Sequence, residues 1–279
     1  MKLIDFDGMF DEKLAKYIEA NKEKHTEKQW EEIIPRLYKK FGDTFVAKIK
    51  CTPKEYYAKM TEIELAQTLA EHLAQDVPVP EFLCAEIEAR DAVPALLPLL
   101  QSNDEATVAY AINLIADDER AFERYFEILK ENRLSVDIQN DVVEFFKLNA
   151  DQVKERLLDL YKQEYCQEYC LEILSRVKTR DEEVYSLLLE SFLTAGEQLP
   201  MRSSYLAAYG DERALPYLLE RIEDMTIGFV EFQELKYAIE ALGGEYNEPR
   251  DFTEDKDYLA VEAAGSGMPD LPESNLPKS

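Results

Sequence analysis

The sequence predicts an all-α protein: an α–α superhelix of about five stacked two-helix units that follows an N-terminal helical cap. Three observations predict this fold. A pattern of ten residues recurs at a nearly constant interval, its apolar positions have helical spacing, and a second apolar helical segment follows each copy. A fixed period of this length is typical of repeat proteins, in which one unit cannot bury its own apolar face and must stack on the next.

The copies of the pattern begin at intervals of 29, 31, 31 and 31 residues, by subtraction of their first positions. They occupy residues 91–100, 120–129, 151–160, 182–191 and 213–222. Their third, sixth, seventh and tenth residues are apolar or aromatic except at Arg156 and Ser191. This i, i+3, i+4, i+7 spacing places the four residues on one helical face, whereas a strand would require alternation by two.

Short polar turns join consecutive units at residues 117–119, 179–181 and 210–212, and each contains Asp or Glu. We expect an acidic side chain in each turn to cap the next helix, where it also meets the positive end of the helix dipole.

The stretch Gly-Asp-Glu-Arg-Ala-Leu-Pro-Tyr-Leu-Leu at residues 210–219 resembles the inter-repeat signature of HEAT-like repeats, in particular the short form named after phycobilisome lyases. Residues 90–97 resemble it too, and the resemblance covers roughly residues 91–245. The middle copies depart from the signature, because Phe122, Val153 and Val184 are not followed by proline. The resemblance implies an α-solenoid that serves mainly as a binding scaffold.

Two groups of enzymes are built from similar repeats. DNA glycosylases of this fold bind duplex DNA in a basic groove, whereas this chain carries a net charge of −28 after residue 60, which repels nucleic acid. Phycobilin lyases need a pocket for the bilin, and no feature of the sequence indicates such a pocket.

Residues 1–80 do not follow the repeat and are expected to form a helical module that caps the array of residues 81–245, because exposed repeat ends need such caps. Helix-capping patterns begin at Thr26, Thr52 and Thr61, the second with proline at the first helical position.

Residues 246–279 are expected to form an acidic C-terminal extension. Within it, residues 246–263 carry aromatic and apolar side chains that can dock on the last repeat, and residues from about 264 onward are expected to be disordered because they are rich in proline and glycine.

The net charge of −26 is unevenly distributed, since residues 1–60 carry 13 Lys+Arg and 11 Asp+Glu, or +2. The acidic remainder repels nucleic acid and anionic membranes and attracts basic partners, although an acidic surface also simply keeps a protein soluble. The basic N-terminal stretch interleaves with aromatic residues, as a nucleic-acid site would, but the acids at 23, 27, 31 and 32 favour a solvated helix face.

The apolar runs are too short to span a bilayer, and the acidic start disfavours a signal peptide. We therefore expect a cytoplasmic protein.

No catalytic, cofactor or metal site is predicted. Asp5-Phe-Asp-Gly8 resembles the first motif of haloacid-dehalogenase-type phosphatases, but that chemistry needs an α/β sheet, so the match is interpreted as coincidence. The chain holds only two histidines, His25 and His72, which disfavours a Ser or Cys nucleophile paired with a histidine base. The four cysteines fit no disulfide framework or zinc motif, although Cys166 and Cys170 are expected to share a helical face.

Tyrosines four residues apart in the third repeat suggest an aromatic strip, which is more often core but on the concave face would anchor a partner. Arg156 interrupts the apolar stripe beside it, either in an ion pair with an acid such as Glu190 or facing a ligand. The partner-binding candidates are Tyr161, Tyr165, Tyr169, Arg156, Tyr205 and Tyr209.

The function predicted from the sequence is non-catalytic protein binding on the concave face of the solenoid, with a basic or amphipathic partner. Two alternatives remain: an enzyme on a HEAT-like scaffold, with a lyase-like or phosphatase-like activity, and an acidic mimic of nucleic acid. The sequence identifies neither the partner nor the oligomeric state.

Overall fold

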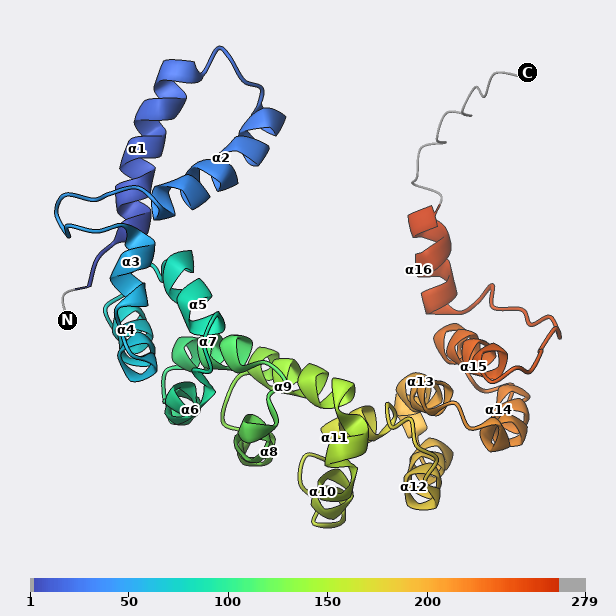
Figure 1. The fold of residues 1–279 in the computed structure, drawn as a ribbon. Coiled ribbons are helices and arrows are strands. Elements are labelled where there is room, and N and C mark those ends of the chain that lie inside the picture. Colours follow the sequence, from blue (N-terminus) through green and yellow to red (C-terminus); the bar gives the residue numbers. More distant parts are fainter. Residues whose placement is uncertain (1–2, 266–279) are drawn as a thin grey trace, which may run out of the picture. The chain divides into compact units, whose positions relative to one another are not determined.

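The computed structural model describes residues 3–265, and every regular element within that range is a helix (Figure 1). The prediction of an all-α fold is therefore confirmed. The chain divides into two compact units with the boundary between Phe145 and Phe146; we refer to residues 3–145 as the N-terminal half and residues 146–265 as the C-terminal half. No helix in the described range combines the length and apolarity that crossing a membrane requires.

Five helices precede the repeats: α1 (Phe6–Asn21), α2 (Glu27–Gly42), α3 (Pro53–Ala58), α4 (Glu62–Ala74) and α5 (Glu81–Glu88). The three predicted caps are present, since Thr26, Thr52 and Thr61 each accept a hydrogen bond from the backbone N–H three residues later and form complete capping boxes. These reciprocal bonds satisfy N–H groups that the first turn of a helix leaves without partners.

Helix α1 begins at Phe6, because Asp5 caps it by accepting a hydrogen bond from the Gly8 N–H at 2.7 Å. A Cβ atom at Gly8 would lie 2.4 Å from the Asp5 carboxylate, so a larger residue there would displace the capping side chain. The Asp5-Phe-Asp-Gly8 motif thus starts a helix, whereas the phosphatase motif that it resembles ends a strand.

Each predicted repeat forms a pair of helices. The first helices are α6 (Val93–Leu96) with the 3₁₀ helix η1 (Leu97–Gln101), η2 (Glu119–Ala121) with α8 (Phe122–Glu131), α10 (Ala150–Lys162), α12 (Glu182–Leu193), and η4 (Glu212–Ala214) with α14 (Leu215–Ile222). The second helices are α7 (Glu105–Ile115), α9 (Val136–Leu148), α11 (Gln167–Leu174), α13 (Leu199–Tyr209), which follows η3 (Gly196–Gln198), and α15 (Phe229–Ala241). The first repeat tightens to 3₁₀ geometry at Pro98, whose missing N–H cannot continue the α-helical bonding.

The apolar face read from the repeat pattern is the buried face of the helices. Tyr125, Leu157, Leu188 and Leu218, all from this face, have no exposed surface. Each side chain of this size contributes about 2 kcal/mol to stability by leaving water. Arg156 points away from this core and is exposed. Within the C-terminal half the second helices α11, α13 and α15 pack in sequence order, as stacked repeats require.

Charged side chains at the repeat junctions bridge one repeat to the next. Arg120, the first residue of its copy, contacts Asp91, the first residue of the preceding copy, at 2.6 Å. Arg213 contacts Glu182 in the same relation at 2.9 Å, and its guanidinium lies 4.2 Å from the centre of the Tyr185 ring. The same geometry therefore recurs at two junctions.

Asp211 is the buried member of this set. It caps η4 by accepting the Arg213 N–H at 3.1 Å, and its carboxylate pairs with the guanidinium groups of Arg213 at 2.7 Å and Arg180 at 3.0 Å. Only 2% of its surface is exposed. Hydrogen bonds from Arg213 lower the pKa of Asp211 to about 2 against the opposing effect of burial.

The junction between the third and fourth repeats uses different contacts. Asp151 accepts hydrogen bonds from the backbone N–H groups of Lys178 and Thr179, at 3.1 and 2.9 Å. Lys154 pairs with Asp181 at 2.5 Å, and Asp181 also caps α12. The predicted acidic caps are thus confirmed at Asp118, Asp181 and Asp211.

The segment after α15 docks on the last repeat, as the sequence predicts. Arg250 donates hydrogen bonds to the carbonyl oxygens of Ile222 and Asp224 and lies over the Phe232 ring. Tyr246 is 9% exposed and packs edge-on against Phe232.

A last helix, α16 (Lys256–Gly265), follows this docked segment, and Asp255 accepts hydrogen bonds from the backbone at its start. Leu259 and Val261 remain 49% and 58% exposed, so the docking stops short of them. The disorder predicted from about residue 264 concerns almost entirely residues 266–279, which lie outside the described part of the chain.

Replacing Asp211 with Asn is expected to lower the free energy of unfolding by about 2 kcal/mol, because the amide still caps η4 but no longer neutralises two guanidinium groups. Urea unfolding followed by circular dichroism measures this loss. The control is Asp91→Asn, which removes an exposed carboxylate from the contact with Arg120 at another repeat junction and should cost much less. Equal losses for the two variants would contradict the role given to burial.

The stability contributed by Asp211 is also expected to depend on pH. Its folded-state pKa of about 2 lies below the ordinary value of 3.8, so the contribution is present above about pH 4 and disappears as the pH falls through about 2. The wild-type protein should therefore lose more stability between pH 4 and pH 2 than Asp211→Asn. Urea midpoints at pH 4, 3 and 2 measure the difference, and parallel declines would refute it.

Candidate functional site

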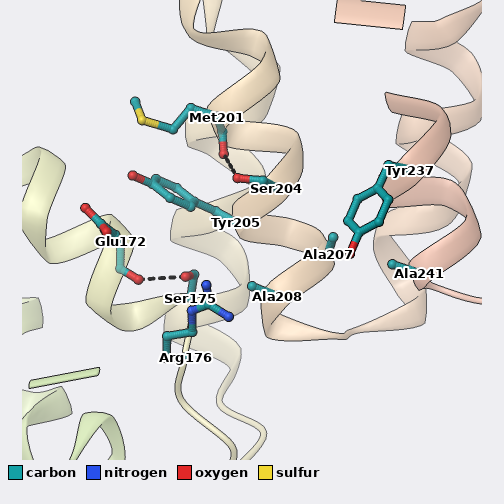
Figure 2. Close-up of a pocket in the computed structure, with 10 residues that line it drawn as sticks. All are labelled: Glu172, Ser175, Arg176, Met201, Ser204, Tyr205, Ala207, Ala208, Tyr237 and Ala241. Carbon is teal, nitrogen blue, oxygen red and sulfur yellow. Dashed lines mark hydrogen bonds between the residues drawn. The ribbon is translucent and has the colours of Figure 1, made fainter. Parts of the chain in front are cut away.

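The second helices of the last three repeats form a groove within the C-terminal half, with a volume of about 410 Å³ (Figure 2). We call it the α11–α13–α15 groove. Its lining residues are Glu172, Ser175 and Arg176 at the end of α11, Met201, Ser204, Tyr205, Ala207 and Ala208 on α13, and Tyr237 and Ala241 on α15.

Small side chains form the floor of the groove. Ser204 and Ala208 lie on one face of α13, four residues apart, and Ala241 faces the groove from α15. Because these residues are small, α13 and α15 pack closely while the groove between their larger neighbours stays open. The Ser204 hydroxyl is satisfied by the Met201 carbonyl at 2.8 Å, and the Ser175 hydroxyl by the Glu172 carbonyl at 2.6 Å, as Figure 2 shows.

Two apolar side chains on the rim are exposed, Tyr237 by 64% and Met201 by 38%. Between the helices, the Tyr205 ring points from α13 towards α11 and is buried (Figure 2). Burial raises the pKa of Tyr205 to about 12, so the phenol stays neutral at physiological pH. An exposed aromatic ring beside a floor of small residues is the arrangement in which a partner can bury much apolar area.

The groove itself holds few charges, but the half of the protein around it is acidic. Glu172 pairs with Lys147 of α9, and Arg176 is exposed at the end of α11. Residues 146–265 contain 13 Lys+Arg and 26 Asp+Glu, a net charge of −13.

A buried arginine lies next to the groove. Arg202 is 4% exposed, and its Nη2 donates to both carboxylate oxygens of Glu168 at 2.5 and 2.7 Å and to Gln198 at 2.5 Å. Its guanidinium carbon lies 5.5 Å from the centre of the Tyr205 ring. Burial raises the pKa of Tyr161, while the charge of Arg202 opposes that rise.

The predicted aromatic strip does not exist as one helical stripe. Helix α10 ends at Lys162 and α11 begins at Gln167, and between them Glu164 and Cys166 adopt positive φ angles of 62° and 36°. Tyr161 is therefore on α10, Tyr165 in the turn and Tyr169 on α11. The turn also removes Cys166 from the helix that carries Cys170, although their Sγ atoms lie 3.9 Å apart.

The remaining candidates have varied surroundings. Tyr165 is 39% exposed, Tyr169 is half-buried, and Arg156 is exposed on α10. The Tyr209 hydroxyl accepts a hydrogen bond from the Asp181 N–H at 2.8 Å and donates one to the Asp181 carbonyl at 3.0 Å. Of the six predicted residues, Tyr205 alone lines the α11–α13–α15 groove.

Tyr237 is the most exposed aromatic residue of the groove, and it is not among the residues predicted from the sequence. Leu235 and Ile239 are four residues apart and are fully buried, as one helical face requires. Tyr237 lies midway between them in sequence and therefore on the opposite face of α15. Its position off the apolar stripe was the available signal.

Removing the Tyr209 hydroxyl by Tyr209→Phe is expected to destabilise the protein by about 1–2 kcal/mol, because the Asp181 N–H loses its acceptor and the Asp181 carbonyl keeps only the Tyr185 N–H as a donor. Tyr237→Phe, which removes an exposed hydroxyl, is the control and should leave stability unchanged. Thermal and urea unfolding measure both variants. If Tyr209→Phe leaves stability unchanged, the structural role of the Tyr209 hydroxyl is refuted, and Tyr209 remains a candidate for contact with a partner.

Residues 3–265 contain no group of three or more His, Cys, Asp or Glu side chains arranged to hold a metal ion. No protein-family model matches the chain, and comparison with curated proteins and with solved structures gave no significant match.

Proposed function

We propose that this chain is a HEAT-like repeat protein that acts as a non-catalytic scaffold and binds a basic, amphipathic helix of a protein partner in the α11–α13–α15 groove. The observation that carries the proposal is the exposure of Tyr237 and Met201 beside a floor of small side chains. The paired helices and the signature-like residues 90–97 and 210–219 support the HEAT-like assignment.

A helix is the form of partner that this groove favours. Extended peptides commonly bind by adding a strand to a sheet edge, and the described residues contain no sheet. An amphipathic helix instead presents apolar side chains at i, i+3, i+4 and i+7, which can pack between Tyr237 and Met201.

Charge favours a basic partner and one orientation. The net charge of −13 over residues 146–265 attracts a basic segment and speeds its association. Arg176, at one end of the groove, interacts best with the negative end of a helix dipole. The partner helix is therefore expected to bind with its C-terminus near Arg176.

The test is fluorescence anisotropy with three labelled amphipathic helical peptides that share one apolar face and carry basic, neutral or acidic polar faces. The basic peptide should bind most tightly and weaken with added salt. Tyr237→Ala should reduce its affinity by about tenfold, the loss typical of an interface anchor.

Matched controls separate the groove from the rest of the surface. Tyr217→Ala removes a 39% exposed tyrosine from α14, a first helix outside the groove, and should leave binding unchanged. Ala208→Arg should abolish binding by filling the groove floor with a like charge. Equal affinity for the three peptides, or insensitivity to Tyr237→Ala, would refute the proposal.

A further inference from the structure

A second cleft, of about 910 Å³, lies in the N-terminal half. Helices α1, α2 and α5 supply most of its lining, and Tyr110 of α7 completes it. It shares no residue with the α11–α13–α15 groove. Its volume is in the range of pockets that hold small organic molecules, about 300–1,000 Å³.

One wall of the cleft is aromatic. The Tyr38 and Phe82 rings are stacked, with centroids 4.6 Å apart and planes inclined by 6°. Phe10 meets Tyr38 edge-on at 5.0 Å. Aromatic rings bury apolar groups by packing, and the negative partial charge of their faces attracts organic cations.

The polar part of the lining is acidic. Asp7, Asp11 and Glu81 line the cleft, and none of them forms an ion pair within residues 3–265. Of the two lysines in the lining, Lys54 is bound to Asp43 at 2.8 Å, which leaves Lys39 as the one opposing charge. The three carboxylates are therefore only partly neutralised.

Asp7 is the most buried of these three carboxylates. Its Oδ1 accepts a hydrogen bond from the Tyr38 hydroxyl at 2.5 Å, and its Oδ2 has no hydrogen-bond partner among the described residues. Burial raises the pKa of Asp7, as do Asp5 and Asp11, whereas the Tyr38 hydroxyl and His72 oppose the rise. A cation brought to this carboxylate would relieve that unfavourable balance.

Two further polar side chains near Asp7 are buried without partners. His72 of α4 and Tyr57 of α3 have no exposed surface, and within the described residues neither ring nitrogen of His72 nor the Tyr57 hydroxyl forms a hydrogen bond. Electrostatic coupling of Tyr57 to Asp7 and Cys84, which both line the cleft, places it beside the cleft. Such groups are costly inside a protein unless something satisfies them.

We propose that this cleft binds a small organic amine, with its ammonium group held by Asp7 and Asp11 and its apolar body packed on the Tyr38–Phe82 stack. The carboxylates provide charge-assisted hydrogen bonds, and the rings provide apolar and cation–π contact. Glu81 adds attraction at the start of α5. This binding is independent of the protein partner proposed above, because the two sites lie on different helices of different halves.

The test uses 2-phenylethylammonium as the probe, with 2-phenylethanol as the neutral analogue and 3-phenylpropanoate as the anionic analogue. Calorimetric titration of the full chain should show saturable binding of the ammonium compound. The alcohol should bind at least about tenfold more weakly, and the carboxylate more weakly still. Equal binding of amine and alcohol, or tighter binding of the anion, would overturn the proposal.

Variants locate the binding. Asp11→Asn removes an exposed carboxylate of the cleft and should weaken amine binding by about tenfold, whereas Glu12→Gln, at the next exposed position on α1, should not. Circular dichroism confirms that each variant is folded. Equal affinities of Asp11→Asn and Glu12→Gln would place the amine elsewhere and refute the assignment.

Discussion

Each helical pair presents an apolar face that a neighbouring pair must cover, and this burial determines where every other kind of residue can lie. The fully enclosed Tyr125, Leu157, Leu188 and Leu218 occupy the same face of successive first helices. Most charged side chains consequently lie at the junctions and on the outer surfaces, and the buried Arg202 is paired with Glu168. The second helices retain one face free of this packing, and the α11–α13–α15 groove forms there. The stability of the fold and the binding surface thus come from opposite sides of the same helices.

The junctions combine two requirements in the same residues. A helix start needs acceptors for its free N–H groups, and stacked repeats need contacts that fix their spacing. Asp211 meets both requirements, since it caps η4 and pairs with Arg213 of its own repeat and with Arg180 of the preceding junction. Asp181 does the same with Lys154 and the start of α12. A polar residue can remain in an otherwise apolar stack because its hydrogen-bonding capacity is used fully.

Local signals in the sequence predicted most of the fold, whereas the candidate sites depend on features that local signals do not carry. The period and the apolar spacing predicted the helical pairs, and the capping patterns predicted the helix starts at Thr26, Thr52 and Thr61. A turn between the helices of each pair was predicted, but its position between Tyr161 and Tyr169 was missed because Glu164 and Cys166 hold positive φ angles that neither residue type signals. The N-terminal cleft was not foreseen because Asp7, Tyr38 and Glu81 meet only through the packing of three helices. Similarly, Tyr237 was not predicted as a site residue, although its spacing places it outside the buried stripe of α15.

The arginine bridges give the order of the repeats a chemical meaning. At the first position of the copy, Asp91 precedes Arg120 and Glu182 precedes Arg213, so the favourable contact joins an acid-first repeat to the arginine-first repeat that follows it. A tandem duplication of either arginine-first repeat would bring two guanidinium groups together at the new junction. Gene duplication, the usual way in which repeat arrays lengthen, would here be opposed by like charges at that junction. The array can grow without this penalty by duplicating an acid-first and an arginine-first repeat together.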